Sequence, residues 1–147
     1  MFTYIKKAQY HETDQMGIIH HSNYVKWMEE ARLAYLEELG LGYKQVEEDR
    51  VFSPVVRVEV HYKTPLHFAD EVEIQVSVQA YSAVRVELSY RFYNPQTAKL
   101  CAEASSEHCF IKDGKIISLK KEMPALHEKL AALVPGKTIT HTGEQKR

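Results

Sequence analysis

Residues Tyr10 to Arg32 read YHETDQMGIIHHSNYVKWMEEAR, and this stretch decides how the rest of the chain can fold. Its first half is a polar loop that holds the acid Asp14 and the glycine Gly17. Its second half has the apolar spacing of a helix that continues to about Leu39, just before Gly40. A carboxylate just ahead of a helix start has a plain chemical use. The unpaired N–H groups of the helix can polarise a carbonyl while the carboxylate activates a nucleophile.

The helix itself is expected to start near Ser22 or Asn23, because either residue can serve as an N-cap. Its apolar positions cover most of its circumference: Tyr24, Val25, Trp27, Met28, Ala31, Leu33, Ala34, Tyr35, Leu36 and Leu39. We therefore expect this helix to be buried on most sides.

The rest of the chain has the period of strands. Apolar and polar residues alternate over 55–63, 71–80 and 84–93, and a fourth run, 100–111, carries small residues on one face. This period predicts antiparallel strands that are covered on one side. A strand over 2–10, short helices over 43–50 and 123–133, and a hairpin turn at Asp113-Gly114 complete the pattern. The economical solution is an α+β fold, a curved antiparallel sheet wrapped around the long central helix, with edges that pairing across a dimer would hide.

Composition narrows the class of protein. The 147 residues fit one domain, predicted over 1–134, followed by a polar tail over 135–147 that we expect to be frayed. With 19 basic and 20 acidic residues and a net charge of -1, nucleic acid is not expected as a partner. No apolar run approaches the ~18 residues of a membrane span, and residues 1–10 lack the apolar stretch of a signal peptide, so no export signal is expected. Cys101 and Cys109 fall eight residues apart in one predicted strand, roughly 26 Å, so they are expected to be free thiols of a cytosolic protein.

The motif residues resemble a known family. The signature of the 4-hydroxybenzoyl-CoA-thioesterase-like acyl-CoA thioesterases, which have the hot-dog fold, is matched by Tyr10, Thr13-Asp14, Gly17 to His21, Asn23-Tyr24 and Glu29-x-Ala31-Arg32. Tyr62-x-x-Pro65 followed by Asp70 also fits, and the resemblance spans residues 2–133. The nearest subgroup is that of the small bacterial thioesterases associated with the Tol–Pal cluster.

The resemblance implies catalytic roles for three residues. Asp14 would activate a water or attack the thioester carbonyl itself, and a backbone N–H near His21 would polarise that carbonyl. The His21 imidazole and Tyr10 would assist. The family carries out this reaction at a dimer interface, so a homodimer that forms a homotetramer is expected, with no metal and no cofactor.

The resemblance also implies where an acyl-CoA substrate would lie. Gly17 and Tyr24 are expected to contact the substrate. Tyr24, Trp27 and Met28 could line an acyl pocket, although an aromatic stripe at helical spacing is more often ordinary core. Coenzyme A would lie along the sheet, with its phosphates near Lys63 or Arg85. The turn before Arg85 is less basic than in many family members, which weakens that last expectation.

Other readings of the same residues remain open. Asp14 alone could simply cap a turn, and His11, Asp14, His20 and His21 could bind a metal, although adjacent loop histidines lack the i, i+4 spacing of a helical zinc pair. No Gly-x-Ser-x-Gly elbow supports serine catalysis. The alternative to an enzyme is a non-catalytic hot-dog subunit that binds an acyl-carrier thioester or a protein partner.

Overall fold

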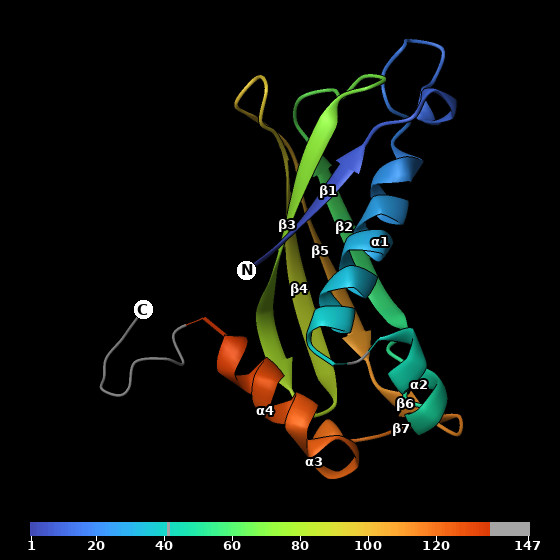
Figure 1. Ribbon diagram of the computed structural model, residues 1–147, viewed down its shortest axis with the longest axis vertical. Coiled ribbons are helices and arrows are strands. Elements are labelled where there is room, and N and C mark those ends of the chain that lie inside the picture. Colours follow the sequence, from blue (N-terminus) through green and yellow to red (C-terminus); the bar gives the residue numbers. More distant parts are fainter. Residues whose placement is uncertain (41, 136–147) are drawn as a thin grey trace.

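The computed structural model describes residues 1–40 and 42–135, which form a five-stranded sheet, a small two-stranded hairpin and several helices (Figure 1). In chain order the elements are β1 (Phe2–Lys7), a 3-10 turn (Tyr10–Glu12), α1 (Ser22–Glu38), α2 (Tyr43–Asp49), β2 (Val55–Tyr62), β3 (Glu71–Ser82), β4 (Arg85–Asn94), β5 (Lys99–Cys109), β6 (Ile111–Lys112), β7 (Lys115–Ile116), α3 (Leu119–Glu122) and α4 (Pro124–Leu133).

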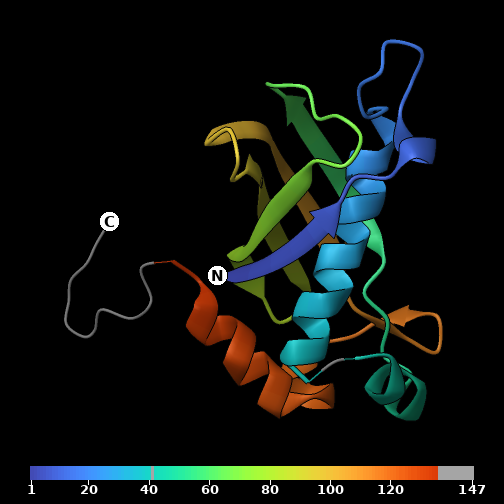
Figure 2. The ribbon, with the colours of Figure 1, turned by 45° about the horizontal axis from the view of Figure 1, so that its top comes forward.

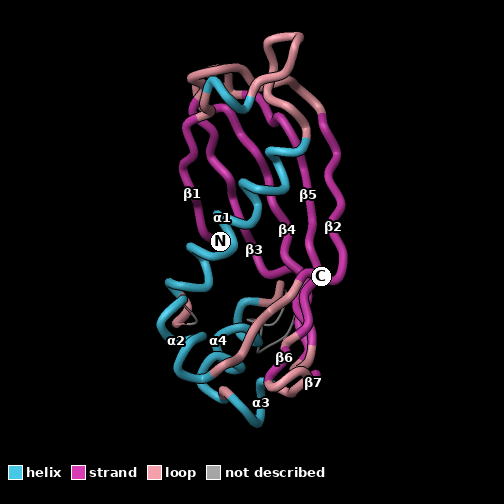
Figure 3. Tube along the Cα trace, turned by 90° about the vertical axis from the view of Figure 1, so that its right-hand side faces the viewer, coloured by secondary structure: helices cyan, strands magenta, loops and turns pink. Residues whose placement is uncertain are grey.

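Five antiparallel strands form the sheet in the order β1-β3-β4-β5-β2, and β6 and β7 form a separate hairpin. The long helix α1 lies along the concave face of the sheet (Figures 2 and 3). The predicted α+β architecture, a curved sheet around one central helix, is therefore confirmed. The predicted tail over 135–147 lies almost wholly outside the described residues. Within the described residues, no helix has the length and apolar character needed to cross a bilayer.

The core forms where the apolar face of the strands packs against the apolar face of α1. On β3 the alternating residues Val72, Ile74 and Val76 are fully buried, and the α1 residues Trp27 and Ala31 are buried as well. Small residues on β5, among them Ala102, Ala104 and Ser106, are also buried. Small side chains on a sheet let a helix approach it closely, which is why this strand can carry them at its centre.

Two expectations about burial need correction. In the described chain α1 is not buried on most sides, since Val25 and Leu33 are 41% and 54% exposed. The strand β2 is one of the two edges of the sheet, and its valines Val55, Val56 and Val58 are 50%, 48% and 38% exposed. The alternation of β2 shows a face suited to burial, but α1 does not reach far enough to cover it.

The ends of the elements differ slightly from the expected ones. The first strand ends at Lys7, because residues 10–12 turn into a 3-10 helix. Gly40 follows the end of α1 with φ +97°, as its predicted role requires. The predicted Asp113-Gly114 turn joins β6 and β7 with positive φ at both residues. Both cysteines are free, as predicted.

Candidate active site

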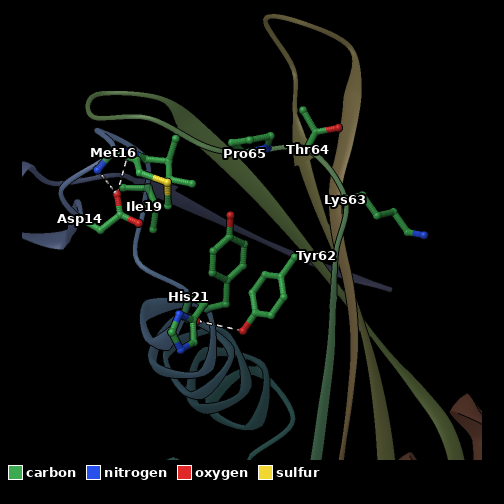
Figure 4. A pocket seen from close by; sticks show the side chains of 10 residues that line it. Asp14, Met16, Ile19, His21, Tyr62, Lys63, Thr64 and Pro65 are labelled. Carbon is green, nitrogen blue, oxygen red and sulfur yellow. Dashed lines mark hydrogen bonds between the residues drawn. The ribbon is translucent and has the colours of Figure 1, made fainter.

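A cavity of about 260 Å³ opens between the loop that carries Asp14, the start of α1 and the end of β2 (Figure 4). It is lined by Asp14, Met16, Ile18, Ile19, His21, Tyr24, Tyr62, Lys63, Thr64 and Pro65. Four of the predicted site residues therefore line one space: Asp14, His21, Tyr24 and Lys63. The first three lie on the loop and the helix start. They come from two segments that are adjacent in sequence, whereas Tyr62 to Pro65 come from a distant part of the chain.

The Asp14 loop is a tight turn that one oxygen of the carboxylate holds in shape. Asp14 Oδ1 accepts the backbone N–H of Met16 at 2.8 Å and that of Ile18 at 3.4 Å. The turn closes where Gly17 N donates to Asp14 O at 3.0 Å. Gly17 has φ +81°, a conformation that favours glycine. The second oxygen, Oδ2, has no hydrogen-bond partner among the described residues, so it is available for chemistry.

A buried carboxylate that the sequence reasoning missed anchors this loop. Glu12 is 8% exposed, and its Oε1 accepts the backbone N–H of Gln9 at 2.8 Å. Its Oε2 accepts the indole N–H of Trp27 at 2.9 Å. Asn23 Nδ2 donates to the backbone oxygen of Glu12 at 2.9 Å. The three-residue spacing from Gln9 to Glu12 is that of a capping box, and it is the sequence signal that could have found this anchor.

The helix start differs from the expected N-cap. The helix begins at Ser22, and His21 occupies the cap position. The amide of Ser22 donates to Nδ1 of His20 at 3.2 Å, and the amide of Asn23 donates to the backbone oxygen of His20 at 3.0 Å. The amide of Tyr24 donates to the backbone oxygen of His21 at 3.2 Å.

These bonds leave one free donor at the helix start. The amides of Ile19 and His20 are also bonded, to Leu66 O and Glu12 O. Within the described residues the amide of His21 alone in this run, 19–24, has no acceptor. It lies at the positive end of the α1 dipole, and His21 lines the cavity. Among the backbone N–H groups near His21 that could polarise a carbonyl, that of His21 itself is therefore the unbonded one.

Two tyrosines form the inner wall of the cavity. Tyr24 and Tyr62 contact edge to face, with ring centroids 4.9 Å apart. Tyr62 Oη donates to the backbone oxygen of His21 at 3.1 Å, which ties β2 to the helix start. Burial raises the pKa of Tyr24 strongly and that of Tyr62 to a lesser degree. Both phenols therefore stay protonated at neutral pH and can donate a hydrogen bond.

Four predicted site residues lie outside the cavity or only touch it. Tyr10 is 75% exposed and packs edge to face on Phe68, so in the single chain its hydroxyl does not line the site. Gly17 holds the turn between the lining residues on either side of it. Lys63 lines the cavity, but its side chain points away in Figure 4, and its Nζ pairs with Glu103 at 3.5 Å.

Arg85 is far from Asp14 within one chain. It pairs in register with Cys109 on β5, whereas Tyr62 pairs with Ala102. These partners are seven residues apart, which is roughly 23 Å along a strand. Arg85 also forms an ion pair with Glu107 at 3.0 Å. Within one chain Arg85 therefore lies far from the Asp14 cavity, and its contact with the coenzyme A phosphates stays a prediction.

Two of the three loop histidines, His20 and His21, lie side by side. His20 and His21 stack with ring centroids 4.3 Å apart, and His20 Nδ1 lies 2.9 Å from Ser22 Oγ. In the described part of the chain no three His, Cys, Asp or Glu side chains converge as metal ligands. The contacts of His20 are those of a residue that caps the helix.

Comparison with known proteins identifies the family that this chain matches. The model of the thioesterase-like superfamily matches residues 8–133. YneP of Bacillus subtilis (strain 168) is 37% identical over 123 residues, 82% of this chain and 88% of that protein. The acyl-CoA thioester hydrolase YbgC of Escherichia coli O157:H7 is 25% identical over 100 residues, 68% of this chain and 75% of that protein.

A solved structure supports the same relationship. A DHNA-CoA thioesterase from Staphylococcus aureus superposes with a TM-score of 0.82 and 35% identity, covering 89% of this chain and 91% of that one. This likeness confirms the hot-dog fold that the sequence resemblance implies.

Proposed function

Because the chain belongs to the thioesterase-like superfamily, we propose that it hydrolyses small to medium acyl-CoA thioesters to the free acid and coenzyme A. One observation carries the proposal: the free oxygen of Asp14 and the free amide of His21 belong to residues that line a single cavity. The names of YbgC and of the Staphylococcus aureus protein, both thioester hydrolases, favour the same reaction class.

In the proposed reaction the thioester carbonyl oxygen accepts the His21 amide N–H at the positive end of α1. The Asp14 carboxylate takes a proton from water, and the hydroxide attacks the carbonyl carbon. The oxyanion of the tetrahedral intermediate stays on the same amide. The carbon–sulfur bond then breaks, and the coenzyme A thiolate leaves as the thiol after taking the proton from Asp14. Direct attack by Asp14 Oδ2, through an anhydride that water hydrolyses, uses the same residues.

A second copy of the chain completes the proposal. The strand β2 has one unpaired edge and exposed valines, Val55, Val56 and Val58. Strand edges of this kind are usually covered. Antiparallel pairing of β2 with its copy would place the Tyr62 end of one strand beside the Val55 end of the other. The end of the partner's sheet that carries Arg85 would then approach the end of this chain's sheet that lies near Asp14. In that arrangement Arg85 of the partner subunit would contact coenzyme A bound at this chain's site.

Several expectations from the sequence stay predictions. Tyr10 lies outside the cavity, and Lys63 lines it but pairs its Nζ with Glu103. Their roles in catalysis and binding stay predictions, as do the homotetramer, the Tol–Pal subgroup and a cytosolic location. The alternative is a non-catalytic hot-dog subunit that binds an acyl-carrier thioester or a protein partner. Such a subunit would leave thioesters intact.

A thiol-release assay across short, long and aromatic acyl-CoAs tests the function. We expect turnover of at least one class, and Asp14→Asn should lower kcat by roughly 10²–10⁴-fold. The amide side chain keeps an oxygen for the turn, so folding should be unchanged. Asp113→Asn, the same change in the β6–β7 turn, is the matched control and should leave turnover intact. Full activity of Asp14→Asn on the best substrate would overturn the mechanism, and no thiol release from any substrate would favour the binding role.

A further inference from the structure

A second pocket, of about 130 Å³, lies between α1 and β2, away from Asp14. Its lining is mostly apolar, with Val25, Met28, Val55 and Val58, and it also includes the charged residues Lys26 and Glu29 and the buried residue His108. The buried polar residues Arg32, Tyr90 and Ser106 form its floor. The three floor residues are at least nine-tenths buried. A polar floor under apolar walls is the usual form of a site for a small ligand.

The floor is a hydrogen-bonded chain whose direction is fixed. The Ser53 backbone oxygen only accepts, so His108 Nδ1–H donates to it, at 3.3 Å. His108 Nε2 must then accept from Ser106 Oγ at 2.7 Å, and Ser106 Oγ accepts from Tyr90 Oη at 2.6 Å. Burial, with the nearby Arg32 charge, lowers the pKa of His108 to about 4. The chain is therefore neutral at pH 7 and offers no counter-ion.

Arg32 is a buried cation with too few partners. It is 7% exposed, and its Nη1 donates to Ser53 Oγ at 3.1 Å. The nearest carboxylate oxygen, Glu29 Oε2, is 3.9 Å from Nη2, beyond hydrogen-bond distance, and the Glu29 side chain is 64% exposed. On the far side of Arg32 the free space is only about 10 Å³. Buried charges are normally paired, so an acceptor for the remaining N–H groups is expected from the second pocket.

We propose that the pocket between α1 and β2 binds a small carboxylate, which pairs with Arg32 while its hydrocarbon part packs on Val25, Met28 and Val58. The guanidinium fork matches the two oxygens of a carboxylate. At ~30 Å³ per water, the pocket has the volume of about four waters, which limits the ligand to a few carbons. The carboxylate has two sources: a free acid, or the far end of an acyl group.

Calorimetry on the full chain tests the binding, with butyrate as the probe and butyramide as its uncharged analogue. Butyrate should bind and butyramide should not. Arg32→Gln should weaken butyrate binding at least tenfold, whereas Glu29→Gln should strengthen it several-fold because it removes a competing negative charge. Arg57→Gln, at an exposed arginine on β2, is the matched control and should change nothing.

Three results would overturn the proposal: equal binding of the two probes, butyrate binding that survives Arg32→Gln, or no binding to the unaltered chain. If Arg32→Gln does not fold, Val58→Trp serves in its place, because it fills the pocket from the edge strand and should abolish binding.

Kinetics separate the two sources, and this arm alone rests on the proposed function. If the carboxylate belongs to the acyl group, Arg32→Gln should lower kcat/KM for succinyl-CoA about tenfold more than for butyryl-CoA. If the ligand is a free acid, butyrate should inhibit both reactions alike and Arg32→Gln should relieve that inhibition. Absence of thiol release from both substrates would count against the thioesterase and leave the calorimetric result standing.

Discussion

The indole Nε1 of Trp27 donates to Oε2 of Glu12 at 2.9 Å, so the loop that carries Asp14 is tied to the second turn of α1 by a buried pair. The Asp14 loop and the helix whose N-terminus it faces are thus joined by a buried hydrogen bond.

Trp27→Phe should remove the donor and leave a buried carboxylate oxygen without its partner. The expected loss is about 1–3 kcal/mol in the free energy of unfolding, because a buried acceptor left unsatisfied bears its desolvation cost. Urea unfolding measures it. Glu12→Gln combined with Trp27→Phe should cost less than the sum of the single changes. Strict additivity would show that the two side chains do not act together.

Gly17→Ala should strain the Asp14 turn. No atom lies within 4 Å of an added Cβ, so the cost comes from φ +81° alone and should be about 1–2 kcal/mol. A strained turn also shifts the Asp14 carboxylate, so kcat/KM should fall. Gly17→Asn is the control, because asparagine tolerates this conformation better. Equal stability of both variants with the unaltered chain would mean that the turn does not require glycine.

His21→Ala should be milder than Asp14→Asn. The variant keeps the backbone N–H that we assign to the oxyanion and removes only the imidazole. A loss of kcat of roughly tenfold is expected, against 10²–10⁴-fold for the carboxylate. Thiol release under saturating substrate measures both. A loss at His21 as large as that at Asp14 would instead make the imidazole a principal acid or base.

Stability should fall as the pH is lowered from about 6.5 to about 4, because His108 is held neutral in the fold. Its pKa is lowered to about 4, chiefly by burial and further by Arg32. In the unfolded chain the His108 imidazole takes up a proton near pH 6.5. Above that pH the imidazole is neutral in both states, so its contribution to the free energy of unfolding is fully present. It is lost on acidification, by about 3 kcal/mol in total. Urea unfolding at several pH values should show that the free energy of unfolding falls less steeply on acidification in His108→Asn than in the unaltered chain. An equal pH dependence in both would exclude His108 as the cause.

Val56→Lys should separate the proposed dimer. The side chain lies on the exposed edge strand, and burying a lysine against a second copy of β2 is unfavourable. Sedimentation or light scattering should report a dimer for the unaltered chain and a monomer for the variant. Ile116→Lys, at an exposed residue of the β6–β7 hairpin, should leave the dimer intact. A monomeric unaltered chain would contradict the arrangement.

The sequence by itself determined the elements and the central turn. Alternation on β3 predicted that Val72, Ile74 and Val76 would be buried, and the helical spacing after Asn23 predicted α1. The spacing of Asp14 and Gly17 predicted the loop ahead of the helix. All of these follow from local rules, since the period of a strand or helix and the conformation of a glycine turn depend on residues a few positions apart.

Only the tertiary structure decided which faces are covered and which distant groups meet. It placed Glu12 beneath Trp27, buried Arg32 without a close counter-ion, left the valines of β2 exposed and set Arg85 at the far end of the sheet from Asp14. A buried polar residue belongs to no repeating pattern in the sequence, so the sequence alone does not reveal its position. Its partner is fixed by the order of the strands and the path of the helix across them, which join residues far apart in the chain.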